Sequence, residues 1–408
     1  MSRWHTVLLS TLTAACASPR GSAQVRPGIE VVLSDSVHLI AGKRLGLLTN
    51  HTGVDHFGRR DADLLRAAPG VRLSVLFSPE HGFRGTEDRE GLPDALDSAT
   101  GLPIYSLYGG SRSAARAALD SIDVLLIDLQ DIGARYYTYP ATAVSLMRDA
   151  ANTRKRVIIL DRPNPVGGTA AQGNVRPQLG DPDSNLVGFL PVAMRHGLTL
   201  GELARMANDL MGLELDLVVV PAAGWKRSMY YDATGMPWVK PSPNMPSLAS
   251  AVLYPGTCLF EGTNLSVGRG TPIAFQILGA PWLEPAKIVA RLRGSGVEGV
   301  DVIDTTFTPV APTDGKYAGL ALPGIRMRVT DRERFEPTRF AVAVLAALHE
   351  THPGRFEFRA SQFDRLATGP ELRRAIEGGR SAREIWESWE PALTRYRAAR
   401  EKYLIYMN

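Results

Sequence analysis

Short continuous apolar runs recur through the first half of the chain, and stretches with a helical pattern separate them. The runs occupy residues 44–50, 72–80, 103–109, 121–130, 156–164 and 215–221. Because they are continuous rather than alternating, they are typical of strands buried on both faces, as in a parallel sheet. Helical patterns lie between them at residues 59–68, 112–120, 139–153 and 200–212, and Thr199 is the expected N-cap of the last. This alternation predicts an α/β fold with a doubly wound, Rossmann-like sheet.

The pattern changes in the second half of the chain. Residues 224–248 are rich in Pro, Gly and aromatic residues and predict an irregular segment. Beyond it, short strand patterns (273–278, 300–303 and 324–329) mix with helical ones (284–293, 336–350, 369–377 and 380–398). We therefore expect a Rossmann-like catalytic domain over residues 28–249 and a smaller α+β accessory domain over residues 250–408.

Composition excludes several classes of protein. The chain has 408 residues, a formal net charge of +4 and no long Lys/Arg run. It is long enough for two cores, and it contains no motif of a nucleic-acid reader. Its two cysteines, Cys16 and Cys258, exclude a disulfide framework.

The N-terminus has the pattern of an export signal. Arg3 is followed by a short apolar stretch and then by small residues, which predicts a signal peptide over residues 1–23 with cleavage after Ala23. The apolar stretch is too short to cross a bilayer. A lipid anchor on Cys16 is the alternative, although Thr13 is a poor start for a lipoprotein signal. We expect an exported, periplasmic or extracellular protein without stable membrane insertion.

Polar residues follow four of the predicted strands where those strands end. They are Asn50 and His51, then Glu80 and His81, then Asp128, Gln130 and Asp131, and finally Asp161, Arg162 and Asn164. In an open α/β sheet, ligands bind at the carboxyl ends of the strands. One such group is explained equally well by a turn or a cap, but four groups at one edge predict a binding site.

Missing motifs narrow the chemistry. The sequence has no G-x-G-x-x-G or P-loop for a nucleotide, no H-E-x-x-H for zinc and no G-x-S-x-G nucleophile elbow. We therefore expect neither a cofactor nor a metal. What remains is a set of carboxylates, namely Glu80, Asp128, Asp131, Asp161 and Glu261.

Carboxylates beside amides, arginines and aromatic rings suit glycoside hydrolysis. One acid protonates the leaving oxygen, and a second group stabilises or attacks the oxocarbenium-like centre. Trp225, Tyr230, Tyr231 and Trp238 are candidates for stacking on sugars, with core packing as the alternative. A non-catalytic sugar-binding protein and an esterase or deacetylase stay open as other functions.

Several long motifs carry a resemblance to a known family. They are NHTGVD (50–55), SPEHGFRG (78–85), DVLLIDLQDIGARYYTY (123–139), LDRPNPVGG (160–168), RHGLTLGELA (195–204), KPSPNMPS (240–247) and YPGTCLFEGTNLSVGRGT (254–271). Together they resemble the exo-β-N-acetylmuramidases of peptidoglycan turnover, from about residue 30 to the C-terminus. The resemblance implies a cleft between the two domains. It also implies release of N-acetylmuramic acid from the non-reducing ends of peptidoglycan-derived muropeptides or disaccharides, without metal or cofactor.

The resemblance also implies roles for individual residues. The family's proposed catalytic glutamate lies in its S-P-E-H-G motif, which makes Glu80 the expected general acid. His81 and Arg84 come with the same motif, and Arg84 is the expected partner of the lactyl carboxylate of N-acetylmuramic acid. Asp128 or Asp131 is the expected base or nucleophile, with the substrate's own acetamido group as the alternative. Beyond what the resemblance implies, matching motifs and strand-end positions add further substrate-binding candidates: Asn50, Gln130, Arg135, Tyr137, Arg162 and Asn164 in the first domain, and Glu261, Asn264 and Arg269 in the second.

Overall fold

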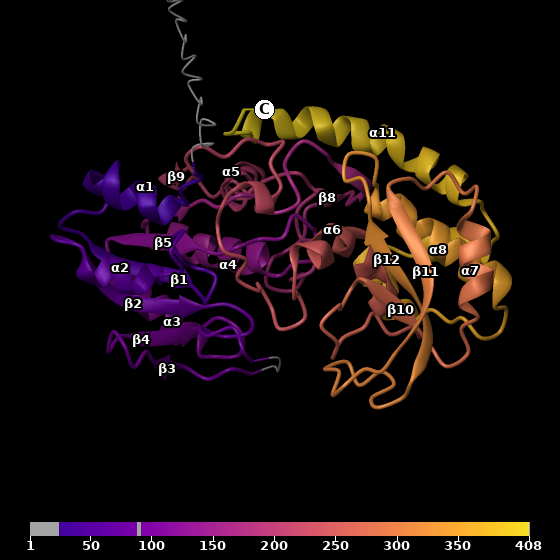
Figure 1. Cartoon of the computed structure of the whole chain (residues 1–408). Helices are drawn as coiled ribbons and strands as arrows, with labels where there is room; N and C mark the ends of the chain where they lie inside the picture. Colours follow the sequence, from indigo (N-terminus) through magenta and orange to yellow (C-terminus); the bar gives the residue numbers. More distant parts are fainter. Residues whose placement is uncertain (1–23, 88–90, 408) are drawn as a thin grey trace, which may run out of the picture.

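The computed structural model describes residues 24–87 and 91–407. The expected signal peptide and Cys16 lie outside the described residues. The chain forms a larger α/β domain, indigo to magenta in Figure 1, and a smaller domain that is mostly orange and yellow. The predicted fold class is confirmed.

The larger domain is built on a sheet of seven strands in the order β3-β4-β2-β1-β5-β6-β9. The parallel strands are β1 (Arg44–Thr49), β2 (Arg72–Ser78), β4 (Pro103–Ser106), β5 (Val124–Asp128), β6 (Arg156–Leu160) and β9 (Leu217–Val220). Strand β3 (Ala95–Leu96) pairs antiparallel at the edge. The order of the parallel strands reverses between β1 and β5, which is the topological switch point of a doubly wound fold.

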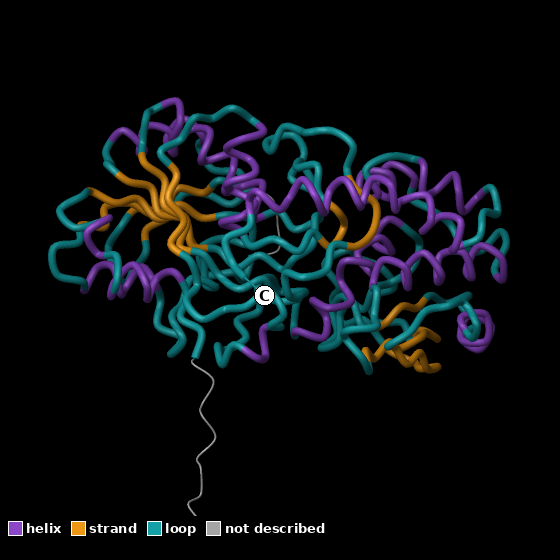
Figure 2. The backbone as a smooth tube through the Cα atoms, turned by 90° about the horizontal axis from the view of Figure 1, so that it is seen from above, coloured by secondary structure: helices purple, strands orange, loops and turns teal. Residues whose placement is uncertain are grey.

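Helices cover both faces of this sheet, as Figure 2 shows from above. On one face lie α1 (Gly28–Ser34) and α2 (Asp61–Ala67). On the other lie α3 (Arg112–Asp120), α4 (Tyr139–Asn152) and α5 (Leu200–Leu210). Alternate residues of each strand serve the two cores: in β5, Val124 and Leu126 pack on one face while Leu125 and Ile127 pack on the other. A continuous apolar run is therefore what this sheet requires.

The smaller domain combines an antiparallel sheet with helices. Its strands, in the order β10-β12-β11, are β10 (Ile277–Gly279), β12 (Leu322–Val329) and β11 (Val300–Phe307). Its helices are α6 (Leu248–Thr257), α7 (Pro285–Leu292), α8 (Pro337–Thr351), α9 (Ala360–Ala367), α10 (Glu371–Glu377) and α11 (Ala382–Arg400).

The C-terminal segment returns to the larger domain. Helix α11 packs against the hairpin formed by β7 (Gln172–Val175) and β8 (Ala193–Arg195), and it runs along the top of both domains in Figure 1. Beyond it, the hydroxyl of Tyr406 donates to Asp161 Oδ2 at 2.7 Å and accepts from the Ala222 amide at 2.8 Å. The end of the chain therefore completes the core of the first domain.

Most predicted elements agree with the structure within a few residues, and Thr199 caps α5 in a capping box with Glu202. The strand expected at 273–278 is an exception, because pairing covers only Ile277–Gly279. Phe275 lies before it in the left-handed region, with φ of 65°, so the backbone there turns rather than extends. Helices α1, α6 and α9 were not predicted.

Candidate active site

A cleft of about 170 Å³ lies between the two domains. The larger domain contributes Glu80, His81, Tyr136, Tyr137, Thr138 and Val187, and the irregular segment contributes Ser242, Asn244 and Met245. The smaller domain contributes Tyr254, Cys258, Glu261, Arg269, Phe275, Gln362, Arg365 and Leu366. Neither domain encloses this space alone.

Glu80 stands at the end of β2 because the strand stops there. Pairing ends at Ser78, and Pro79 has no amide hydrogen with which to continue the ladder. The Glu80 side chain is partly exposed in the cleft and accepts a hydrogen bond of 2.5 Å from the hydroxyl of Thr138. Thr138 is the N-cap residue of α4, so two elements of the larger domain fix this carboxylate.

The turn after Glu80 depends on left-handed backbone. His81, Gly82 and Gly85 have φ of 69°, 72° and 69°. At Gly85 a Cβ atom would come within 1.8 Å of the His51 ring, so no other residue fits that position. His81 Nδ1 lies 2.8 Å from the carbonyl oxygen of Glu87, which fixes the ring beside Glu80.

Glu261 faces the cleft from the smaller domain. It lies in the 3-10 helix η3 (Cys258–Gly262) that follows α6. Its carboxylate accepts from Arg269 Nε at 2.6 Å, and the two side chains are 14% and 21% exposed. Arg269 also donates to the hydroxyl of Thr313 at 3.2 Å. This pair is the only carboxylate–arginine ion pair among the described residues that line the cleft.

Aromatic side chains form the wall between the two glutamates. Tyr254 makes edge-to-face contacts with Tyr136 and Phe275, at centroid distances of 6.2 and 4.7 Å. Burial raises the pKa of the Tyr137 and Tyr254 phenols well above their ordinary value, so both stay neutral donors. Such a wall offers apolar faces and hydroxyl groups, which together suit a sugar ring.

The aromatic residues proposed from the sequence serve a different purpose. Trp225 and Tyr231 are buried in a core cluster with Tyr406, and Trp238 packs against it. Tyr230 lies between Arg195 and Arg332. The core-packing alternative therefore describes their surroundings.

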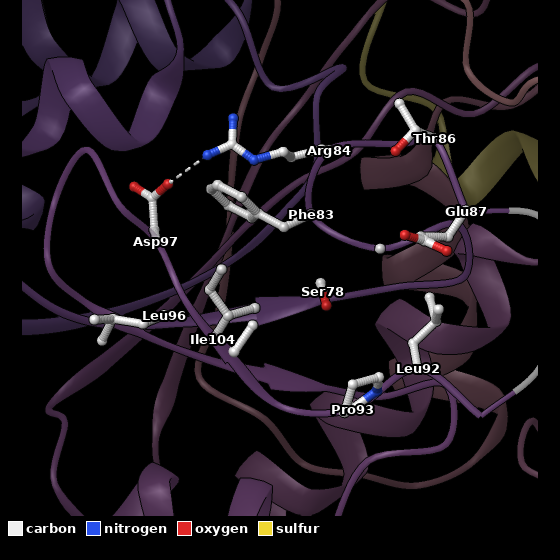
Figure 3. A pocket seen from close by; sticks show the side chains of 12 residues that line it. Ser78, Phe83, Arg84, Thr86, Glu87, Leu92, Pro93, Leu96, Asp97 and Ile104 are labelled. Atoms are coloured by element: carbon white, nitrogen blue, oxygen red, sulfur yellow. Dashed lines mark ion pairs between the residues drawn. The ribbon is translucent and has the colours of Figure 1, made fainter.

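Arg84 lies outside the cleft. It lines a separate cavity of about 240 Å³ next to β4, floored by Phe83, Leu92 and Ile104 (Figure 3). Its guanidinium lies 3.7 Å from Asp97 and donates to Ser98 at 3.2 Å, and the side chain is 64% exposed. This placement is a correction: Arg84 does not share a cavity with Glu80.

Asp128 is also misplaced for catalysis. It is fully buried at the switch point and pairs with Arg162, whose Nη2 donates to its carboxylate at 3.0 Å. Asp61 lies in the same cluster, bonded to Thr49 at 2.5 Å. Burial and the charge of Asp128 raise the pKa of Asp61 well above its usual range, and burial likewise raises that of Asp128. The site where a doubly wound fold usually binds its ligand is thus filled by protein.

Asp131 has no access to the cleft either. It is 4% exposed, accepts from the Gly133 amide at 2.8 Å and lies 3.2 Å from His196 Nε2. These contacts hold a loop. They argue against Asp128 and Asp131 as base or nucleophile.

The other strand-end candidates fix the backbone around the cleft. Asn50 accepts from Thr52, Gln130 donates to the Pro163 carbonyl, and Asn164 donates to the Leu198 carbonyl. Asn264 donates to the Arg355 carbonyl. Arg135 is buried and donates to Asn174 and to the Leu366 carbonyl of α9, so it ties the two domains together beneath the cleft. Burial lowers its pKa to about 10.

The structure therefore unites five predicted residues in the cleft: Glu80, His81, Tyr137, Glu261 and Arg269. It adds residues that were not predicted: Thr138, Ser242, Asn244, Gln362 and Arg365. Ser242 and Asn244 lie in KPSPNMPS, and Thr138 is the second-last residue of the motif at 123–139, so those motifs carried a signal. Gln362 and Arg365 sit on α9, where nothing in the sequence marked them.

Two further findings concern the described residues alone. They contain no group of three or more His, Cys, Asp or Glu side chains arranged to hold a metal ion. None of the helices at 24–87 and 91–407 is long and apolar enough to span a bilayer.

Two family models match the chain. Residues 45–249 match the model described as exo-beta-N-acetylmuramidase NamZ, N-terminal, and residues 252–406 match its C-terminal counterpart. The peptidoglycan beta-N-acetylmuramidase NamZ of Bacillus subtilis (strain 168) is 38% identical over 408 residues, covering 98% of this chain and 97% of that protein.

Solved structures agree with this match. A DUF1343 family protein from Bacteroides fragilis NCTC 9343 has a TM-score of 0.84 at 34% identity, covering 95% of this chain and 100% of that one. A second DUF1343 family protein from the same organism has a TM-score of 0.74 at 32% identity, with the same coverage.

Proposed function

The chain belongs to the exo-β-N-acetylmuramidase NamZ family, and we propose that it releases N-acetylmuramic acid from the non-reducing ends of peptidoglycan fragments with Glu80 as general acid. It is a glycoside hydrolase. One observation carries the assignment of the acid: Glu80 and Glu261, from different domains, are the two carboxylates among the described residues that line the cleft. Most glycoside hydrolases place two carboxylates on either side of the scissile bond.

The two glutamates take different roles in this proposal. Glu80 sits in a turn with a hydroxyl donor, and it protonates the glycosidic oxygen as the bond breaks. Glu261, oriented by Arg269, supplies negative charge beside the oxocarbenium-like centre or beside the attacking acetamido group.

The lactyl carboxylate of N-acetylmuramic acid calls for a cation, since two glutamates already face the cleft. Arg84 lies in another cavity, and Arg269 is paired with Glu261. Arg365 is exposed at the cleft, and among the described residues its side chain has no hydrogen-bond or ion-pair partner. We assign the lactyl carboxylate to Arg365, because a guanidinium binds a planar carboxylate through two parallel hydrogen bonds.

The test compares chromogenic β-glycosides of N-acetylmuramic acid and N-acetylglucosamine. The wild-type protein should cleave the first only. E80Q should lower kcat about a thousand-fold, and the matched control E387Q, on an exposed face of α11, should leave it unchanged. Activity that survives in a folded E80Q protein would remove Glu80 from the chemistry.

Arg365 is tested with the same substrates. R365Q should raise KM for the muramic acid glycoside roughly tenfold and leave KM for its lactyl amide unchanged. The exposed R383Q on α11 is the control. If R84Q rather than R365Q raises KM, the carboxylate binds in the other cavity.

The two other functions predict different results in the same assay. A sugar-binding protein would retain the glycoside without releasing chromophore, and a deacetylase would release acetate instead. Two carboxylates facing an anionic sugar favour hydrolysis over simple binding, because binding alone gains nothing from their repulsion.

We also propose that the chain is exported, since residues 1–23 have the pattern of a signal peptide. N-terminal sequencing of the mature protein tests this. A first residue at Gln24 supports cleavage after Ala23, a lipid-modified Cys16 supports an anchor, and an intact Met1 contradicts both.

A further inference from the structure

The loop between β11 and β12 places a lysine beneath the loop that carries Glu261. Lys316 is only 5% exposed. Its Nζ donates to three backbone carbonyl oxygens: those of Glu261 at 3.0 Å, Thr263 at 2.8 Å and Leu265 at 2.9 Å. An ammonium group has three hydrogens to donate and accepts none, so these carbonyls use its whole capacity.

Neighbours of Lys316 contact the same part of the cleft. The Tyr317 hydroxyl donates to the Asn264 carbonyl at 2.6 Å, which lies between two of the carbonyls that Lys316 holds. The Thr313 hydroxyl accepts from Arg269 at 3.2 Å and from Asn244 at 3.3 Å, and both of those residues line the cleft. Three residues of one loop therefore contact Glu261, Arg269 and Asn244, or the backbone that carries them.

A buried ammonium is a costly way to fill this space, because desolvation opposes it. In a neutral side chain, a single atom carries at most two hydrogens that it can donate. No neutral side chain can therefore donate from one atom to the carbonyl oxygens of three alternate residues. The three hydrogen bonds hold the backbone of residues 261–265 around one ammonium group. They therefore fix the position of the Glu261 Cα atom, from which the side chain extends into the cleft.

We propose that Lys316 is a positioning residue for the hydrolytic reaction, holding the 261–265 backbone so that Glu261 and Arg269 face the substrate. The inference rests on the role given above to Glu261. It concerns a residue that touches no substrate and acts through that loop.

The charges around Lys316 give the inference a pH signature. Arg359, Asp314, Glu261 and Arg269 face it, and burial, the largest influence, lowers its pKa to about 8. Above that pH the neutral amine keeps two hydrogens and turns a lone pair toward the carbonyls. We therefore expect kcat to fall on the alkaline side with an apparent pKa near 8.

Global unfolding does not explain such a fall. The pKa of Lys316 is lower in the folded chain than the ordinary value of 10.5, so the unfolded chain binds this proton more tightly. Between about pH 8 and 10.5 this group therefore stabilises the fold further as pH rises. Activity and this contribution to stability move in opposite directions across the window.

The experiment measures kcat and KM from pH 6 to 10 for wild type, K316M, E261Q and the E261Q/K316M double variant. K287M, an exposed lysine on α7, is the matched control. K316M should lower kcat about tenfold with KM changed less than threefold, and its kcat should lose the decrease near pH 8 that the wild type shows, while any alkaline decrease caused by Glu80 itself remains. The kcat of the double variant should be only slightly lower than that of E261Q alone, because both substitutions remove the contribution of Glu261.

Each outcome bears on one claim. If E261Q keeps full activity, the proposed role of Glu261 fails. If E261Q is impaired while folded K316M stays within twofold of wild type, or if the two losses multiply in the double variant, the inference about Lys316 is overturned. If K316M does not fold, the test uses Y317F and the dependence of wild-type kcat on pH. The inference is supported if Y317F lowers kcat two- to fivefold and if the kcat of the wild type falls near pH 8. The lack of either result overturns it.

Discussion

Two groups of charged residues each include a carboxylate at the end of a strand of the larger sheet, and the groups differ in where their hydrogen-bond and ion-pair partners come from. The first, which we call the buried group, consists of Asp61, Asp128, Asp161 and Arg162; each is at most 2% exposed. The second, the cleft group, is Glu80, Glu261, Arg269 and Arg365, all at least partly exposed. From the sequence alone, Asp128 and Glu80 look alike.

The difference shows what separates charged residues that hold the structure from charged residues that can act on a substrate. Every member of the buried group bonds to other parts of its own domain or to the returning C-terminal segment. The cleft group faces solvent and draws on both domains, so its carboxylates keep free lone pairs for a substrate. A charged residue whose hydrogen-bond partners all lie inside the protein contributes to the stability of the fold. A charged residue in the cleft that keeps unused hydrogen-bond donors or acceptors is available to a substrate.

The largest expected effect comes from breaking the ion pair of the buried group. D128N leaves the Arg162 guanidinium in the interior without its counter-charge, which should lower the free energy of unfolding by about 3–5 kcal/mol. Urea denaturation measures the loss. The fraction that stays folded should retain the KM of wild type; a changed KM in a stable D128N protein would place Asp128 in the cleft group.

The next effect is on the pH dependence of stability. Burial raises the pKa of Asp161 from 3.8 to about 6. The folded chain therefore binds this proton more tightly than the unfolded chain, and stability from this residue falls by about 3 kcal/mol as pH rises from about 4 to 6, then levels off. Urea midpoints at pH 4 to 8 should show this fall in wild type relative to D161N. Parallel curves for the two proteins would contradict it.

A smaller effect should follow from removing the hydroxyl that orients the catalytic acid. T138V keeps the shape of Thr138 but deletes its bond to Glu80. The lost hydrogen bond is worth about 1–1.5 kcal/mol, or roughly a tenfold lower kcat with little change in KM. Steady-state kinetics measure both constants. A rise in KM alone would mean that Thr138 binds substrate instead.

The smallest effect is expected at the second cavity. R84Q removes a mostly exposed guanidinium that contacts Asp97 and Ser98. Stability should change by less than about 1 kcal/mol, and kcat/KM by less than about twofold. Thermal unfolding and kinetics on the muramic acid glycoside check both. A tenfold loss of activity would extend the substrate site to this cavity.

The sequence predicted the larger domain well because local pattern and tertiary burial agree there. The run Val124–Ile127 is apolar at every position since both faces of β5 are covered. In the smaller domain the apolar pattern misplaced a strand near Phe275. The side chain there is apolar because it is buried, but the backbone turns instead of extending. Apolar character alone does not distinguish these cases.

The strand-end rule placed a predicted residue in the cleft where that residue both ends a strand and faces the other domain. Glu80 satisfies both conditions, whereas Asp128 satisfies only the first. Pairing of Asp128 with Arg162 joins positions 34 residues apart, and Arg365 reaches the cleft from a helix that no strand-end rule covers. Which polar side chains pair with one another in the interior depends on the tertiary structure, so a local sequence pattern does not reveal it.

The bond between Tyr406 and Asp161 has a consequence for the order of assembly. The two residues are 245 positions apart, so β6 leaves the ribosome long before the segment that completes its surroundings. The first domain stays open along this edge until the segment that carries Tyr406 has left the ribosome. Docking of this late segment, rather than synthesis of the strands themselves, is then the step that completes the core around Asp161.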